Sequence, residues 1–313
     1  MGINEIIVIV LGLTLFEVIS SIDNAVVNAD VLSTMSAKAR RWFLFYGIII
    51  AVFVVRGLLP LLIVYFTNTN LGLWGALTAT FSSDPMIKDA IEASKPILLG
   101  GGGLYLVFLF LHWLFTEKKD YAFFIERHVH QKLYFWFYAA ASIILLAFVW
   151  ATIKINPMIA LGAVIGSSAF FITSGFKNNA EEKEKELTGG GRMSDIAKIL
   201  YLELIDTTFS IDGVLGAFAF TLSVPLIIIG NGIGAFVVRY VTVKGINTIK
   251  KYRYLKNGAM YSIASLGAIM MAESLSVHVQ SFVPPLITFI VVGLFFWLSV
   301  KELKMHKTGK DKV

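Results

Sequence analysis

The feature that most constrains this chain is a series of apolar segments, each long enough to cross a lipid bilayer as a helix. A spanning helix needs roughly 20 mostly apolar residues, and about nine segments meet that requirement. We predict spans near residues 5–30, 42–66, 95–116, 133–153, 157–175, 196–221, 225–244, 256–275 and 283–301. Only 15% of the residues are charged, whereas soluble domains carry about 25%. The predicted fold is therefore an all-α, polytopic transmembrane helix bundle.

Basic residues orient this predicted bundle. Lys and Arg are concentrated in every second loop, near residues 38–41, 118–132, 177–198 and 244–256, and in the tail after residue 300. Cytoplasmic loops of membrane proteins carry such an excess, which predicts that the N-terminus lies outside and the C-terminus inside. The net charge of +6 has the same origin and gives no reason to expect a nucleic-acid partner.

A short acidic motif occurs twice. The tripeptide Ser-Ile-Asp ends at Asp23 in the first predicted span and again at Asp212 in the sixth. Another acid lies six residues before each aspartate, at Glu17 and at Asp206. Two copies with the same internal spacing indicate an internal repeat, which decides the architecture of a chain like this one.

A second tripeptide supports the repeat. Val-Val-Arg ends at Arg56 in the second predicted span and at Arg239 in the seventh. The two copies are offset by an odd number of spans, so they have opposite orientations and form inverted-topology repeats, as in many secondary transporters. The predicted organisation is a first repeat with its connecting spans (1–175), a hydrophilic cytoplasmic linker (176–195), a second repeat (196–301) and a basic cytoplasmic tail (302–313).

Polar residues inside the predicted spans are the candidate functional residues, because a charge at the bilayer centre costs about 2.5–3.5 kcal/mol on insertion scales. The candidate metal ligands are Glu17, Asp23, Asn24, Asp206 and Asp212. The candidates for supporting or gating roles are Ser21, Asn28, Arg56, Ser210, Arg239 and His112. Two arginines cannot neutralise four carboxylates, so a cation or protons are expected. In the alternative, the arginines neutralise two acids and only lock helices together.

The spacing of the motif also makes a prediction about the helices. Glu17 and Asp23 would lie about 9 Å apart along a regular helix and point about 120° away from each other. They can converge on one ion only if the helix is broken. We predict breaks at Ser-Ile-Asp-Asn, which ends at Asn24, and at Ser-Ile-Asp-Gly, which ends at Gly213, because unwound segments coordinate ions in many transporters.

The residue types favour a hard cation. Carboxylate and amide oxygens suit divalent ions such as Mn²⁺, Mg²⁺ or Ca²⁺. The chain has no cysteine, which excludes a disulfide scaffold, a thiolate metal site and a cysteine nucleophile. His112 is the one histidine with a candidate intramembrane role, and packing is favoured over ligation for it. No prosthetic group is predicted; the divalent cation is the transported substrate, and protons are a candidate counter-ion.

The two acidic blocks, residues 17–24 and 206–214, resemble the paired motifs of the TerC family, which is part of the LysE-type exporter superfamily. The Ser-x-Asp-Gly-Val run of the second block is typical of one branch of that family. The resemblance covers most of the chain and implies a multi-pass protein of the bacterial inner membrane, with manganese export as its activity and tellurite resistance as its historical label. The chain departs from the relatives at Gly213, where many carry Ser, and at His112, where relatives of this branch carry Asp.

Three functions stay open from the sequence. The first is export of a divalent cation, not an enzymatic activity, through a midplane site between the two repeats. The second is an intramembrane aspartyl hydrolase, in which two aspartates share a proton and activate water, although the Gly-x-Gly-Asp context of such proteases is absent. The third is a membrane scaffold in metal-stress (tellurite) resistance. A homo-oligomer is compatible with all three.

Overall fold

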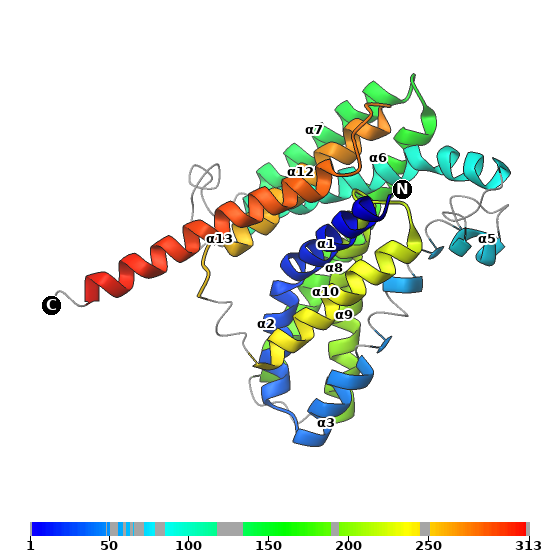
Figure 1. Ribbon diagram of the computed structural model, residues 1–313. Helices are drawn as coiled ribbons and strands as arrows, with labels where there is room; N and C mark the ends of the chain where they lie inside the picture. The colour runs from blue at the N-terminus through cyan, green and yellow to red at the C-terminus, as the bar shows by residue number, and fades with distance from the viewer. Residues whose placement is uncertain are drawn as a thin grey trace.

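The computed structural model describes residues 2–47, 49–50, 56–58, 61–62, 65, 72–78, 85–117, 134–188, 194–244 and 251–310, and the regular structure in these residues is helical throughout (Figure 1). The elements are α1 (Ile3–Ser20), α2 (Ile22–Ser33), α3 (Ala37–Trp42), the π-helical turn η1 (Phe43–Gly47), α5 (Gly72–Thr78), α6 (Pro85–Thr116), α7 (Tyr134–Thr152), α8 (Pro157–Thr188), α9 (Asp195–Ala217), α10 (Val224–Lys244), α12 (Leu255–Ser274) and α13 (Val283–Lys310).

Six stretches in the described helices are long and apolar enough to cross a membrane. They are Ile3–Ser20, Ser94–Thr116, Phe135–Thr152, Pro157–Lys177, Val224–Thr242 and Val283–Met305. Each coincides with a predicted span, and together they indicate a multi-pass helical membrane protein. The helices α9 and α12 also coincide with predicted spans, but they are more polar than these six. Of the predicted span 42–66, residues 48, 51–55, 59–60, 63–64 and 66 lie outside the described residues. Nine spans and the orientation of the termini therefore stay predictions.

Helix α6 packs mainly against α8 and α12, and α1 packs mainly against α10. In Figure 1, α6, α7, α12 and α13 form one group, and α1, α2, α9 and α10 form another, with α8 between them. Glycines bring α6 and α8 into close contact: a Cβ atom added at Gly101 would lie 2.6 Å from the carbonyl oxygen of Gly162. Small residues at such crossings let helix backbones approach each other in a membrane. The glycine run of α6 is thus a packing surface, at which Gly100 and Gly101 approach α8 and Gly102 and Gly103 approach α12.

The first acidic motif contains an interruption. Ser21 separates α1 from α2 with φ −94° and ψ 5°. The backbone ladder continues across it, because the Ser21 N–H donates to the Glu17 carbonyl (3.1 Å) and the Ala25 N–H donates to the Ser21 carbonyl (2.9 Å). The predicted break in the first motif is therefore a local departure at one residue and not an unwound segment.

The second predicted break is wrong. Helix α9 continues from Asp195 to Ala217 through the whole second motif. A glycine inside a helix costs only about 1 kcal/mol relative to alanine, and Gly213 is packed against α1, where its missing side chain leaves room for the Glu17 carboxylate. Packing of this kind readily offsets the low helix propensity of glycine, so the sequence signal for a break was misleading here.

Three helices extend well beyond the predicted spans: α6, α8 and α13, of which α13 continues to Lys310 in the predicted tail. Helix α6 begins at Pro85, so Pro96 lies inside the helix and not at its start. Helix α8 continues to Thr188, well into the segment 176–195 that was predicted to be a linker. Residues 176–188 are therefore helical, while residues 189–193 lie outside the described residues. This extension of α8 carries Lys177 toward α9, with consequences for the candidate site.

Candidate functional site

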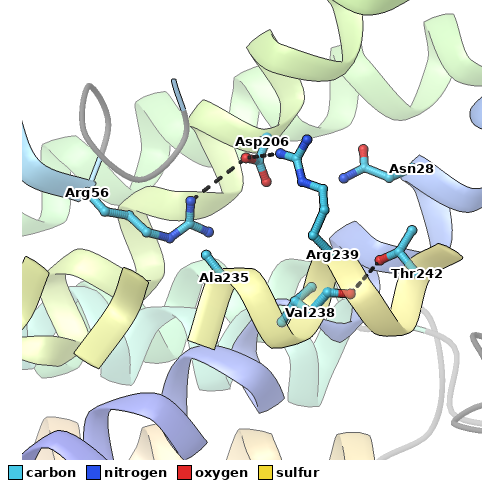
Figure 2. A pocket seen from close by; sticks show the side chains of 7 residues that line it. All are labelled: Asn28, Arg56, Asp206, Ala235, Val238, Arg239 and Thr242. Carbon is cyan, nitrogen blue, oxygen red and sulfur yellow. Dashed lines mark hydrogen bonds and ion pairs between the residues drawn. The ribbon is translucent and has the colours of Figure 1, made fainter. Parts of the chain in front are cut away.

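Arg56 connects acidic residues from the two predicted repeats. Its Nε and Nη2 atoms both donate to Glu17 Oε1, at 2.9 and 2.6 Å. Its Nη1 atom lies 3.8 Å from Asp206 Oδ2 (Figure 2). The three side chains are almost completely buried. An ion pair removed from water in this way is strongly destabilised when one partner is lost, because the other charge is left uncompensated. Arg56 thus fastens α1 to α9 through two carboxylates.

Arg239 binds the same aspartate from the opposite side. Its Nη2 atom donates to Asp206 Oδ2 at 3.1 Å (Figure 2). Its Nη1 atom lies 4.0 Å from Glu203 Oε1. The guanidinium also donates to the Phe43 carbonyl at 3.1 Å and stacks 4.1 Å from the centre of the Phe43 ring. Cation–π contacts of this kind strengthen when they are desolvated. Asp206 is therefore shared between two arginines.

These ion pairs occupy equivalent positions in the two copies of the sequence repeat. Arg56 binds Glu17, the upstream acid of the first motif, and Arg239 binds Asp206, the upstream acid of the second. Such equivalence is what a repeat of the acidic motif and the Val-Val-Arg tripeptide predicts. Arg56 and Arg239 therefore have the partners expected if each arginine neutralises the acid of its own repeat.

A second pair of contacts also involves equivalent positions of the two repeats, but these contacts join one half to the other. The Thr14 hydroxyl on α1 donates to the Gly230 carbonyl on α10 at 3.2 Å. The Glu203 carboxylate on α9 lies against Gly47, where an added Cβ atom would collide with it. Thr14 and Glu203 each lie three residues before the upstream acid of their motif, and the two glycines each lie nine residues before the arginine. Each acidic helix therefore packs against the arginine-bearing segment of the other half, as related halves that cross each other would.

Asp212 has different partners. The Tyr105 hydroxyl from α6 donates to Asp212 Oδ1 at 2.5 Å, and Lys177 Nζ from α8 forms an ion pair with Asp212 Oδ2. Tyr105 is positioned in turn by the Thr173 hydroxyl, 2.9 Å away. The sequence interpretation assigned Lys177 to a cytoplasmic linker and missed this cluster. Thr173 and Lys177 are four residues apart, so they share one face of a helix. Once α8 is known to continue past residue 175, this spacing indicates that the two side chains lie near each other.

The other candidate residues fall into separate places. The Ser21 hydroxyl donates to Glu17 Oε1 at 2.8 Å. The Ser210 hydroxyl donates to the Asp206 backbone carbonyl at 2.5 Å and not to a carboxylate. His112 lies in an aromatic cluster, with ring centroids 5.3 Å from Phe137 and 6.0 Å from Phe170, so packing accounts for its contacts here.

The remaining two candidate ligands, Asp23 and Asn24, are part of the backbone of α2, but their side chains lie outside what the structure describes. Their predicted role as metal ligands stays a prediction.

A small cavity adjoins the two arginines. It is lined by Asn28, Arg56, Asp206, Ala235, Val238, Arg239 and Thr242 (Figure 2), and its interior has room for about one water molecule. Asn28 Oδ1 is buried here without a hydrogen-bond partner among the described residues, as are Glu17 Oε2 and Asn231 Oδ1 nearby in the bundle. Buried polar atoms in folded proteins are almost always hydrogen-bonded. These acceptors are therefore positions that favour a donor or a cation.

The described carboxylates do not converge on a single point. Among the residues that the structure describes, no group of three or more His, Asp or Glu side chains is arranged to hold a metal ion. Glu17 and Asp206 meet at Arg56, whereas Asp212 is bound by Lys177 and Tyr105. The predicted charge imbalance is reduced, because Lys177 is a third internal cation. With Glu203 included, four described carboxylates still face three basic side chains.

Most of the chain is similar to a known protein family. Residues 22–306 match the model of the family described as "Protein of unknown function (DUF475)". The matched region contains both arginines, Lys177 and the second acidic motif, and it begins shortly after Glu17. No curated protein and no solved structure gives a match.

Proposed function

The chain belongs to the DUF475 family, and from the chemistry of its buried charges we propose that it is a membrane transporter that exports a divalent cation, with Mn²⁺ as the foremost substrate. The observation that carries this proposal is the position of Arg56 between Glu17 and Asp206, two acids from the two predicted repeats. Buried negative charge from both predicted halves thus meets at one place, and secondary transporters built from inverted repeats bind their substrates at such a junction.

The buried carboxylates explain why the substrate is a cation. Ionised side chains inside a membrane bundle are costly and mark substrate and ion pathways. Each described carboxylate of the motif already contacts a basic side chain, so an entering cation replaces an arginine or lysine in part. The internal basic groups hold the carboxylates when the substrate has left, which avoids the penalty of about 3–5 kcal/mol for a buried charge without a partner.

Oxygen donors decide the class of cation. Glu17 Oε2 and Asn28 Oδ1 are buried acceptors without a donor among the described residues. The proposal assigns Asp23 and Asn24 as further oxygen ligands on the sequence motif alone. Hard divalent ions take six or more such ligands. The resemblance to the TerC family favours Mn²⁺ over Mg²⁺ and Ca²⁺. The same proposal includes nine spans, inverted repeats, a cytoplasmic C-terminus and residence in a bacterial inner membrane.

The hydrolase alternative requires two aspartates from two different spans that share a proton, and the two motifs offer Asp23 and Asp212 for this role. Such a pair must lie within hydrogen-bonding distance, because the shared proton depends on mutual repulsion. Asp212 contacts Lys177 and Tyr105, whereas the side chain of Asp23 lies outside what the structure describes. No contact among the described residues specifically favours a scaffold.

Transport by the purified full chain tests the proposal. We expect proteoliposomes that contain the wild type to move Mn²⁺ down a gradient, and we expect Glu17→Gln and Asp206→Asn to reduce the initial rate by at least about tenfold, the kinetic equivalent of ~1.4 kcal/mol. Asp23→Asn, the change suggested by the sequence motif, should act in the same direction. The matched control is Glu302→Gln, which removes a carboxylate that pairs with Arg253 near the surface and should transport as the wild type does.

Two results would overturn the proposal. One is a folded wild type that moves none of Mn²⁺, Mg²⁺ and Ca²⁺. The other is transport that is equally fast in the wild type, Glu17→Gln and Asp206→Asn. Cleavage of a membrane-embedded peptide that is lost in Asp23→Asn and Asp212→Asn would favour the hydrolase instead.

A further inference from the structure

Among the motif acids whose side chains the structure describes, Asp212 pairs with a lysine, whereas Glu17 and Asp206 pair with arginines. Both of its carboxylate oxygens are engaged, Oδ1 by the Tyr105 hydroxyl at 2.5 Å and Oδ2 by Lys177 Nζ. The Asp212 side chain is only 9% exposed. Each oxygen thus already has a partner, so a metal ion that binds Oδ2 competes with the ammonium group for the negative charge of Asp212.

Lys177 is the partner that can move. Its side chain is 14% exposed, compared with 2% for Arg56 and 7% for Arg239. The apolar part of α8 that can span the membrane, Pro157–Lys177, ends at this residue. A lysine at the end of a membrane helix can place its charged group in the aqueous interface while its aliphatic stem stays on apolar surface. Lys177 therefore has two places for its ammonium group, the Asp212 carboxylate and the interface.

The other partner is held more firmly. Tyr105 is fully buried in α6. Its hydroxyl also contacts the Thr173 hydroxyl, and Thr173 in turn donates to the Ala169 backbone carbonyl at 2.9 Å. Its ring packs edge-to-face against Phe170, with 5.8 Å between centroids. The geometry thus separates a fixed donor on Oδ1 from an exchangeable cation on Oδ2.

We propose that Lys177 is a tethered cation that occupies Asp212 and competes with the transported divalent ion for this carboxylate. This inference rests on the proposed function and adds the residue that sets the affinity for the substrate. When a divalent cation binds Oδ2, the Lys177 ammonium group swings to the interface. When the cation leaves, the ammonium returns and prevents the buried charge from remaining without a partner. Lys177 thus weakens binding and speeds release.

Binding of Mn²⁺ to the purified full chain, measured by equilibrium dialysis, tests this competition. Removal of the competitor should tighten binding, so Lys177→Gln should lower the Kd for Mn²⁺ by about tenfold. Lys177→Arg keeps a cation at this place and should bind as the wild type does. In an Asp212→Asn background, Lys177→Gln should no longer change the Kd. The matched control is Lys256→Gln, which breaks a lysine–carboxylate pair with Glu117 nearer the surface and should leave the Kd unchanged.

A second measurement uses the unaltered protein and so does not depend on how any variant folds. Saturating Mn²⁺ should increase the rate at which an amine-acylating reagent modifies Lys177, because the ammonium group has moved to the interface. Lys256 should react at a constant rate.

The outcomes separate this inference from the proposed function. If the wild type binds Mn²⁺ but Lys177→Gln binds it equally or more weakly, Lys177 is only a structural link between α8 and α9 and the inference is wrong, while the transporter proposal stands. If Mn²⁺ binds but the rate of Lys177 acylation does not change, the inference is wrong in the same way. If neither the wild type nor any folded variant binds a divalent cation, the proposed function fails and the competition fails with it.

Discussion

The two copies of the acidic motif differ in the continuity of their helices and in the partners of their serine and arginine side chains. In the first copy, Ser21 interrupts the helix and its hydroxyl donates to the Glu17 carboxylate. In the second, α9 is continuous and the Ser210 hydroxyl donates to the backbone. The arginines differ as well: Arg56 binds acids from both halves, whereas the acids that Arg239 binds both lie on α9.

This difference suggests a division of roles within the proposed transporter. A regular helix with its own ion pairs is suited to be a rigid frame, while a helix with a local interruption has a place at which it can bend. Sequence-related halves need not be mechanically alike. In this view α9 and α10 form the frame, and the junction of α1 and α2 is the element that changes shape. The following changes compare one copy with the other.

The largest effect is expected for the arginines. Arg56→Met leaves the Glu17 charge buried without the arginine, and we expect it to lower the free energy of unfolding by about 3–5 kcal/mol. Arg239→Met should cost less, because Asp206 keeps its 3.8 Å contact with Arg56. Unfolding by SDS in mixed detergent micelles, followed by circular dichroism, gives both values.

The double variant Glu17→Gln/Arg56→Met is the control for this comparison. It removes the acid and the base together, and it should be more stable than Arg56→Met alone. An equal or larger loss in Arg239→Met than in Arg56→Met would contradict the idea that Arg56 is the main link between the halves.

An intermediate effect is expected at Gly213, where α9 passes α1. An added Cβ atom would lie 2.6 Å from Glu17 Oε2, so Gly213→Ala forces the Glu17 side chain to shift. Overpacking of this kind costs about 1–3 kcal/mol. The same SDS unfolding assay measures the loss.

Gly175→Ala on α8 is the matched control, because nothing lies within 4 Å of the added Cβ atom there. It should be neutral or stabilising by up to about 1 kcal/mol, since alanine is the better helix former. If both substitutions were neutral, Gly213 would not be a point of close contact between the two motifs.

The contrast between the copies could be predicted only in part. Apolar length and composition are local properties, so the helical bundle and six of its spans followed directly from the sequence. The requirement that buried charges have partners made Arg56 and Arg239 candidates to pair with the motif acids. The acid that each arginine binds depends on how α1, α9 and α10 cross. No local sequence pattern determines these crossings.

Lys177 and Gly213 show where the local signals failed. Hydropathy marks where a helix leaves the bilayer, not where the helix ends, so the continuation of α8 to Thr188 and the pairing of Lys177 with Asp212 were missed. A break was predicted at the motif that ends at Gly213 because unwound segments coordinate ions in many transporters, but α9 is continuous there. The role of Gly213 depends on a neighbour distant in sequence, Glu17, which fills the space that a side chain would need.

The smallest effect is expected for the two serines, and it tests the difference between the copies most directly. Ser21→Ala removes a buried hydrogen bond of 2.8 Å to Glu17 Oε1. Bonds to charged groups contribute about 1.5–3 kcal/mol, but Arg56 donates to the same oxygen, so we expect a loss of about 1 kcal/mol. Ser210→Ala removes a bond to a backbone carbonyl that the helix already satisfies, and serine back-bonding slightly destabilises helices. It should therefore change stability by less than about 0.5 kcal/mol.

The serine pair also distinguishes a bending point from a mere irregularity. If the junction of α1 and α2 changes shape during transport, Ser21→Ala should slow Mn²⁺ efflux in proteoliposomes by more than Ser210→Ala does, even at a temperature where both variants are fully folded. Equal efflux rates in the two variants, together with equal unfolding free energies, would mean that the interruption at Ser21 has no mechanical role. The two copies of the motif would then differ in local geometry alone, and α1 would have to be treated as part of the frame that α9 provides.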